Sequence, residues 1–158
     1  MDVPFVDLKA QYLSIKNEID RAISTVIADA SFIGGRPVKE FENKFKQLYG
    51  TNHCVGVANG TDAIYIALKM LGIKEGDEVI TVANSWISTS ETISQAGAKP
   101  VFVDIDPNTY TIDPTLIEER ITSRTKAIIP VHLYGQAAHI SLIRDLCAKR
   151  GLHLIEDC

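Results

Sequence analysis

The sequence has only three cysteines and one tryptophan, no surplus of positive charge and no long apolar run. Cys54, Cys147 and Cys158 are odd in number and widely spaced, which argues against a disulfide framework or a zinc knuckle and favours a reducing compartment, the cytoplasm. A formal net charge of −4 lacks the basic footprint of a nucleic-acid-binding protein. No stretch approaches the roughly 18 apolar residues of a membrane span. The acidic start MDVPFVDLKAQY lacks the apolar core of a targeting peptide. We therefore expect no nucleic acid, membrane or metal as a partner.

The overall composition is that of a globular protein. The N-terminal part of the sequence has a helical pattern. Hydrophobic residues make up 46% of the 158 residues and charged residues 23%, which argues against disorder. Over residues 8–29, apolar residues recur at intervals of three and four, which predicts a helix with one apolar face. A glycine pair breaks this pattern, and Pro37 opens a second predicted helix that ends near Tyr49. We expect residues 1–52 to form an N-terminal helical segment.

After residue 52 the pattern changes to short apolar runs that alternate with amphipathic stretches. The apolar runs predict strands at 53–58, 78–83, 100–104, 126–131 and 152–156. The amphipathic stretches predict helices at 61–71, 86–96, 114–121 and 139–150. This alternation indicates an α/β fold with a mostly parallel sheet flanked by helices. We expect residues 53–158 to form this domain, with Pro130 shortening the fourth strand and an uncovered edge at the fifth.

The turn Asn59-Gly60-Thr61 stands where the first predicted strand leads into a helix. In open α/β sheets the ligand crevice lies outside the carboxyl ends of the strands. Glycine lets a ligand approach the backbone there, and the unpaired N–H groups and dipole of a helix start favour a phosphate. The simpler interpretation, an N-cap with a turn glycine, stays open. Neither a Walker loop nor a GxGxxG pattern occurs, so a nicotinamide-binding Rossmann domain is not indicated.

Two further side chains follow predicted strand ends. Trp86, the single tryptophan, stands at the first turn of a predicted helix. Its ring could stack on an aromatic ligand, or it could simply pack against the protein. Asp157 follows an apolar strand, where a carboxylate needs a partner. That partner could be a protonated nitrogen of a cofactor, or the carboxylate could serve as a cap or in an ion pair.

The other polar residues near the strand ends have plainer interpretations. Asp104 and Asp106 invite a metal or paired-acid interpretation, but Asp106-Pro107-Asn108 is a turn opener and we favour the turn. The histidines show no ligand spacing, and only His132, at a strand end, is kept as a site candidate. His53 and His153 alternate with apolar neighbours and are expected to be structural. The cysteines are expected to be buried small hydrophobic residues.

Seven segments together carry a resemblance that no single motif would establish. They are VPFVDLKAQY at 3–12, FIGGRPVKEFENKF at 32–45, VANGTDAIYIALKMLGIKEGDEVIT at 57–81, ANSWISTSETISQAGAKPVFVDID at 83–106, YTIDP at 110–114, KAIIPVHLYGQ at 126–136 and LIEDC at 154–158. In order and spacing the chain resembles the N-terminal part of the DegT/DnrJ/EryC1/StrS family of sugar aminotransferases, which use pyridoxal 5′-phosphate (PLP). The likeness covers essentially all of this chain but less than half of a usual family member. One departure, Ala137 in place of a frequent proline, affects no chemistry.

The resemblance implies the N-terminal part of a fold type I aminotransferase large domain, with the PLP-dependent transferase-like architecture. It implies that Gly60, Thr61 and Asp62 form the turn that holds the PLP phosphate. By the same resemblance, Trp86 stacks on the pyridine ring and Asp157 pairs with the pyridine nitrogen. An adjacent carboxylate stabilises the protonated nitrogen, which makes the ring an electron sink.

The activity implied is transfer of an amino group, from glutamate, to a nucleotide-linked keto sugar by a homodimeric enzyme. In this family a downstream lysine forms the Schiff base with PLP, and none of the ten lysines here matches its motif. We therefore assign no catalytic residue within this chain and expect it to be inactive alone. His132 and Tyr134 lie in a family motif without a firm role. Two alternatives stay open: a PLP-type sugar dehydratase of the same family, and a non-catalytic module that binds a phosphorylated ligand.

Overall fold

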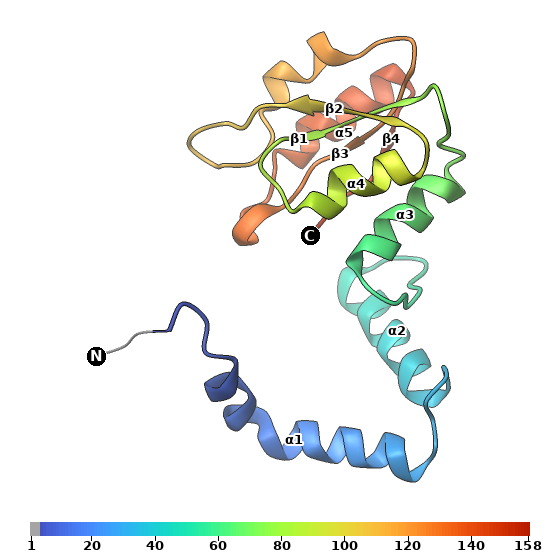
Figure 1. Ribbon diagram of the computed structural model, residues 1–158, viewed down its shortest axis with the longest axis vertical. Helices are drawn as coiled ribbons and strands as arrows, with labels where there is room; N and C mark the ends of the chain where they lie inside the picture. Colours follow the sequence, from blue (N-terminus) through green and yellow to red (C-terminus); the bar gives the residue numbers. More distant parts are fainter. Residues whose placement is uncertain (1–3) are drawn as a thin grey trace. The chain divides into compact units, whose positions relative to one another are not determined.

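The computed structural model describes residues 4–158 and divides into two compact units, Met1–Gly56 and Val57–Cys158. The first unit is helical, and the second is built on a β-sheet with helices around it (Figure 1). Within the described residues, no helix is long and apolar enough to cross a membrane.

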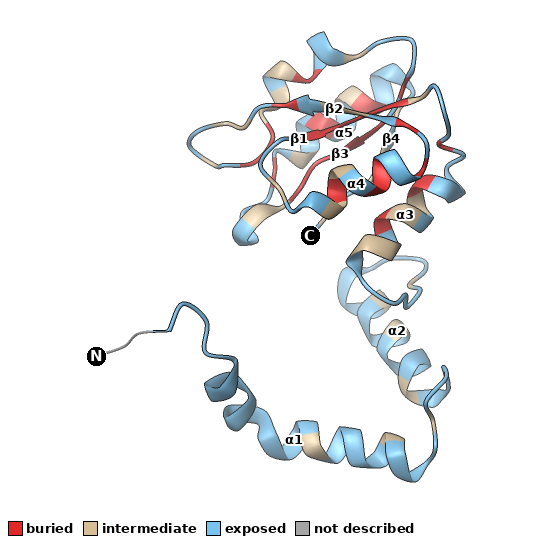
Figure 2. Cartoon of the chain, in the orientation of Figure 1, coloured by how far each residue is buried: buried red, intermediate tan, exposed pale blue. Residues whose placement is uncertain are grey.

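The first unit consists of two helices, α1 (Leu8–Ala28) and α2 (Arg36–Tyr49). Both confirm the helices predicted from the apolar spacing. Gly50 ends α2 in the left-handed conformation, which glycine adopts without strain. None of residues 4–56 is buried, so the apolar faces of both helices lie at the surface of this unit (Figure 2).

The second unit contains a four-stranded sheet in which the paired strands run parallel. The strands are β1 (Glu78–Val82), β2 (Lys99–Val103), β3 (Thr125–Ile129) and β4 (His153–Leu154), in the spatial order β2-β1-β3-β4. The predicted α/β fold with a mostly parallel sheet is confirmed. Pro130 follows β3 directly, as the sequence predicts, because proline has no N–H to donate to the ladder. Of the strand predicted at 152–156, only the two residues of β4 form a strand in the structure, and β4 pairs with β3 alone.

Helices cover both faces of this sheet (Figure 1). They are α3 (Gly60–Met70), α4 (Ile87–Gln95) and α5 (Ile140–Arg150). Because successive side chains of a strand point to opposite faces, Val79 packs with the α3 and α4 side chains, while Ile80 packs with α5. Two layers of buried side chains, one on each face, hold the central strands and so fix where the strand ends lie. Figure 2 shows that the buried positions gather on these strands and on the helices beside them.

The strand predicted at 53–58 does not form, and this prediction was wrong. The period-2 apolar pattern is present, but Val55 stays 75% exposed and no strand of residues 4–158 pairs with it. The local polar groups bond to side chains instead of to a ladder. Gly56 donates its N–H to Glu42 Oε1 at 2.7 Å, and the Thr51 hydroxyl donates to the carbonyl of His53 at 3.1 Å. A strand pattern forms a strand only where a neighbour supplies hydrogen bonds.

The helix predicted at 114–121 was also wrong in kind. The structure has two single-turn 3₁₀ helices, Pro114–Leu116 and Glu118–Arg120. Their bonds join residues three apart, such as Arg120 N to the Ile117 carbonyl at 3.0 Å. In a segment this short, an α-helix would form few hydrogen bonds for the number of backbone dihedrals that it fixes. The segment therefore forms two separate tight turns, on either side of the buried Ile117.

Candidate functional site

The predicted phosphate turn lies at the start of α3. Asn59 caps the helix, since its Oδ1 accepts the Asp62 N–H at 2.8 Å, so the N-cap interpretation of this turn is correct. Of the main-chain N–H groups at this helix start, the Asn59 side chain pairs only with that of Asp62. The N–H groups of Gly60 and Thr61 therefore stay available, because the first N–H groups of a helix have no carbonyl partner within it. A side chain added at Gly60 would meet no atom within 4 Å, so the backbone there is open to approach.

The first turn of α4 is joined to this turn by a side-chain hydrogen bond. The Thr61 hydroxyl donates to Ser88 Oγ at 2.8 Å, across 27 positions of sequence. Trp86 is the N-cap residue of α4 and is 77% exposed, so its ring is not packed into the core of residues 57–158. The same turn lines a cavity of about 190 Å³ whose walls include Ser85, Trp86 and Thr89.

Asp157 reaches the same turn of α4 from the end of the chain, which lies beside α4 in Figure 1. Thr89 donates its hydroxyl to Asp157 Oδ2 at 2.7 Å, across 68 positions of sequence. The main chain of Asp157 bridges in parallel to Val131, which continues the pairing of β4 with β3. The predicted need of this carboxylate for a partner is therefore met in part by a neutral hydroxyl.

His132 lies next to Asp157 but is occupied by its own neighbours. Its main-chain N–H donates to the carbonyl of Asp157 at 2.8 Å. Its Nδ1 accepts the N–H of Ala138 at 3.0 Å, and its Nε2 lies 3.0 Å from Glu156 Oε2. With Nδ1 accepting, Nε2 carries the proton and donates to the carboxylate. The ring therefore holds the loop after β3 in place. Nearby Tyr134 is exposed and has a φ of 55°, a rare conformation for a non-glycine residue.

The plainer sequence interpretations meet mixed outcomes. Asp106 opens a turn as predicted, its Oδ1 accepting the Asn108 N–H at 2.8 Å. Among residues 4–158, no three His, Cys, Asp or Glu side chains gather as a metal site would require. The prediction that the cysteines are buried holds for Cys147, where burial raises the pKa of the thiol to about 11. It is wrong for Cys158, which is exposed, and Cys54 is half-buried.

Sequence reasoning missed three hydroxyl side chains, Ser85, Ser88 and Thr89. They bond to the predicted site residues or to one another around the first turn of α4. The sequence contained an indication, because Ser85, Ser88 and Thr89 all lie around the predicted start of the helix that follows β1. What the sequence could not show is which distant residue each hydroxyl meets.

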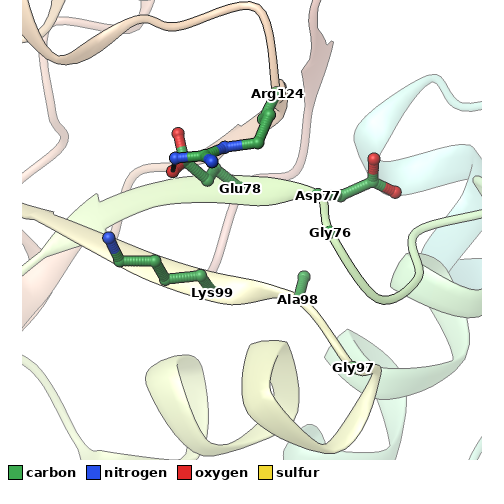
Figure 3. Close-up of a pocket in the computed structure, with 7 residues that line it drawn as sticks. All are labelled: Gly76, Asp77, Glu78, Gly97, Ala98, Lys99 and Arg124. Atoms are coloured by element: carbon green, nitrogen blue, oxygen red, sulfur yellow. Dashed lines mark hydrogen bonds and ion pairs between the residues drawn. The ribbon is translucent and has the colours of Figure 1, made fainter.

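A separate cavity of about 360 Å³ opens at the other, amino end of the strands (Figure 3). It contains an ion pair between Glu78 Oε1 and Arg124 Nη2 at 2.6 Å, and Thr122 donates to Glu78 Oε2 at 2.6 Å. The hydrogen bond from Thr122 and then that from Arg124 hold the pKa of Glu78 below its ordinary value. This cavity holds none of the predicted site residues, and its ion pair ties the start of β3 to that of β1.

The comparison of the whole sequence with protein families decides the assignment. The model of the DegT/DnrJ/EryC1/StrS aminotransferase family matches residues 13–158. The chain belongs to this family. The DegT/DnrJ/EryC1/StrS resemblance inferred from the seven segments is thereby confirmed.

Individual relatives and solved structures are similar to most of the chain. The UDP-2-acetamido-2-deoxy-3-oxo-D-glucuronate aminotransferase of Pseudomonas aeruginosa is 47% identical over 98% of this chain and 43% of its own length. The structure of DesV from S. venezuelae, in complex with a ketimine intermediate, superposes with a TM-score of 0.95 at 42% identity, covering 98% of this chain and 42% of that one. The E. coli GDP-4-keto-6-deoxy-D-mannose-3-dehydratase, with bound hydrated PLP, gives 0.81 at 34% identity over 87% and 37%. The chain thus spans about two fifths of the length of these relatives.

Proposed function

We propose that residues 57–158 bind PLP and that the protein transfers an amino group from glutamate to a nucleotide-linked keto sugar. The observation that carries this proposal is the convergence on one helix turn. Trp86 is the N-cap residue of α4, Thr61 bonds to Ser88 in the first turn of that helix, and Asp157 bonds to Thr89 in the same turn. These are the residues whose roles the family resemblance implies.

The start of α3 suits the phosphate of the cofactor. The free N–H groups of Gly60 and Thr61 and the positive end of the helix dipole attract an anion. Gly60 leaves the backbone uncovered. Asp62 also lies in this turn, but its main-chain N–H is already committed to Asn59, so we assign Asp62 to shaping the turn.

Trp86 and Asp157 suit the ring of the cofactor. The exposed face of Trp86 offers a flat apolar surface on which a pyridine ring can stack. Asp157 offers a carboxylate that stabilises a protonated ring nitrogen. PLP, when bound with its nitrogen protonated, supplies an electron sink for the carbon that gains or loses the amino group. Within this chain the residues bind and orient, and none of its ten lysines matches the family's Schiff-base motif.

We therefore propose that the 158-residue chain does not transaminate by itself. Supplying the purified chain with glutamate and a nucleotide-linked keto sugar should yield no 2-oxoglutarate above the background. Steady turnover would overturn this. The intact mass of the protein produced from its natural gene should be measured as well. A mass above 17.4 kDa would show additional chain that could carry the Schiff-base lysine.

A second candidate function is dehydration of a nucleotide-linked keto sugar by the same cofactor. It is favoured by the similarity to the PLP-bound E. coli dehydratase, at 34% identity. Aminotransferase and dehydratase are distinguished by the product when the natural protein is given glutamate and a keto sugar. An amino sugar supports the first, and a deoxy sugar with loss of water supports the second.

Cofactor binding is tested directly with pyridoxamine 5′-phosphate (PMP). PMP carries an amine instead of an aldehyde, so it cannot react with surface lysines. Because Trp86 is the only tryptophan of the chain, quenching of its fluorescence reports on this site alone. We expect saturable quenching, weakened by Asp157→Asn and unchanged by the control Asp106→Asn in a surface turn. Quenching that fails to saturate, or that is equally weak in both variants, would contradict the proposal.

We further propose a homodimer in the cytoplasm for the intact protein. The apolar side chains that α1 and α2 leave exposed would suit a subunit interface. The odd and widely spaced cysteines suit a reducing compartment. Light scattering on the purified natural protein would give the mass of a dimer, and a monomer mass at micromolar concentration would refute this assembly.

A further inference from the structure

The main chain of Asp157 is fixed by the sheet. Its N–H donates to the carbonyl of Pro130 at 3.1 Å, and its own carbonyl accepts the N–H of His132 at 2.8 Å. These two bonds extend the parallel pairing of β4 and β3 by one bridge, between Val131 and Asp157. They place the Cα atom, but they leave the side-chain dihedrals of Asp157 free. Something else must decide where the carboxylate points.

Thr89 is the group that bonds to this carboxylate. Its hydroxyl lies 2.7 Å from Asp157 Oδ2, and the residue is only 2% exposed. An ionised carboxylate can only accept, so Thr89 donates its proton to Oδ2. The Ser85 hydroxyl lies 3.1 Å from Thr89 Oγ1 and therefore must donate to it. Among residues 4–158 no other group donates to this carboxylate, which leaves Oδ1 for another partner.

The same residue is bonded to the stacking tryptophan. The main-chain N–H of Thr89 donates to the carbonyl of Trp86 at 3.2 Å. Thr89 thus holds Trp86 through its main chain and Asp157 through its side chain. A shift of either one relative to the other must break or stretch one of these two bonds.

The hydroxyl of Thr89 has a different hydrogen-bond partner from the one that is usual for a threonine inside a helix. A buried threonine in a helix usually returns its hydroxyl to a carbonyl one turn earlier. Thr92, three residues further along α4 and fully buried, does this with the carbonyls of Ser88 at 2.9 Å and Thr89 at 3.2 Å. Thr89 instead directs its hydroxyl out of the helix, to a residue 68 positions away.

We propose that Thr89 is a positioning residue that holds the Asp157 carboxylate with Oδ1 free to pair with the pyridinium nitrogen of the cofactor. The inference rests on the proposed function, because it presupposes a PLP-type ligand between Trp86 and Asp157. Ser85, which donates to Thr89, orients the threonine hydroxyl toward Asp157.

The test measures ligand affinity by calorimetry in apoprotein purified from the natural gene. Two ligands are compared: PMP, and its 1-deaza analogue, in which C–H replaces the ring nitrogen and no ion pair can form. Thr89→Val, which keeps the shape but removes the hydroxyl, should weaken PMP about tenfold, the loss expected for one hydrogen bond to a charged group. The same substitution should leave the affinity for the deaza analogue unchanged within about twofold. Thr89→Ser should restore PMP binding.

Thr92→Val is the matched control, since it removes a buried hydroxyl from the same helix without touching Asp157. It should leave both affinities unchanged. A Thr89→Val protein that loses affinity for both ligands equally would show that Thr89 only supports the fold, and one that loses neither would show that Asp157 needs no positioning. A wild-type protein that binds neither ligand would instead refute the proposed function, so the two failures are distinguishable.

Discussion

Glu78, the first residue of β1, is a charged residue whose side chain is almost fully buried. Only 4% of this side chain is exposed. The carboxylate is kept there by the Thr122 hydroxyl and the Arg124 guanidinium, which each reach one oxygen at 2.6 Å. A buried charge is tolerated only when its oxygens are paired. The two donors stand in the loop before β3, so this side chain ties the start of β3 to the start of β1. Figure 3 shows the contact between Glu78 and Arg124.

We predict that Glu78→Gln lowers the free energy of unfolding by about 1–2 kcal/mol at pH 7, because it exchanges a charged acceptor for a neutral one. The pKa of Glu78 is lowered from 4.5 in the folded chain, chiefly by Thr122. Its contribution is therefore complete above about pH 4.5 and is lost as the pH falls through the folded pKa. Below pH 4.5 the wild type should lose stability more steeply than the variant.

Urea denaturation from pH 7 to pH 3 measures both effects. Glu75→Gln, in the exposed turn before β1, is the control and should follow the wild type at every pH. Parallel curves for wild type and Glu78→Gln would show that the ion pair contributes no pH-dependent stability.

Asn59 combines two roles at the start of α3 that a pair of substitutions can separate. Its side chain caps the helix through the Asp62 N–H, and its position places it beside the proposed phosphate site. Asn59→Ala removes the cap and should lower the free energy of unfolding by about 1 kcal/mol. Asn59→Asp keeps the cap acceptor but exchanges the Nδ2 donation to Asp62 Oδ2, at 3.3 Å, for a like charge at the surface, so it should lower the free energy of unfolding by only about 0.5 kcal/mol.

The same two variants should rank in the opposite order when PMP affinity is measured: Asn59→Asp should be the weaker binder, although it is the more stable variant. A new negative charge repels a phosphate a few ångströms away by roughly 1 kcal/mol in water, so Asn59→Asp should bind PMP about fivefold more weakly. Denaturation curves and fluorescence titration give the two quantities independently. If Asn59→Asp bound PMP as tightly as the wild type, the phosphate would have to lie elsewhere.

At the scale of elements, the turn between α4 and β2 depends on the absence of a side chain. Gly97 has a φ of 94°, and a Cβ there would lie 3.1 Å from the N atom of Glu75. We predict that Gly97→Ala lowers the free energy of unfolding by about 2 kcal/mol, from backbone strain plus crowding against a main chain that cannot easily move.

Gly76 provides the comparison that isolates the crowding. Its φ is 90°, but a Cβ there would meet nothing within 4 Å. Gly76→Ala should therefore lose only the strain, about 1 kcal/mol. Equal losses for the two variants in thermal denaturation would mean that the contact with Glu75 is relieved by a shift of the turn.

The elements themselves differ in how far the sequence determines them. The strands that became β1 and β3 are predictable because each has a mostly buried apolar run and pairs with a neighbour on both sides. The edge strand β2 pairs with β1 alone, and of its residues only Val103 is buried. The run at 53–58 has the same local pattern and no pairing partner within residues 4–158, which local pattern cannot reveal. The same limit applies at the site. Trp86 can be placed from the sequence because it follows the end of β1, whereas the bond of Thr89 to Asp157 spans 68 positions and depends on the sheet order.

At the scale of the whole molecule, burial is concentrated in residues 57–158, and none of residues 4–56 is buried. Amide hydrogen exchange depends on how readily each segment opens, and segments without buried apolar contacts open most easily. We predict that β1 and β3 exchange slowest and that α1 and α2 exchange fastest, by more than about a hundredfold. Mass spectrometry of peptic fragments measures this. Comparable protection of α1 and β1 would show that α1 is covered in solution.

The first turn of α4 also bears on the order of events at the ribosome. Its bonds reach back to Thr61 and forward to Asp157, so the contacts that arrange the proposed cofactor site all lie within residues 57–158. Domains generally fold as units while the chain is made at about 5–20 residues per second. Thr61 and Asp157 are 96 positions apart, so the proposed cofactor site cannot be complete until about 5–20 s after Thr61 has been made.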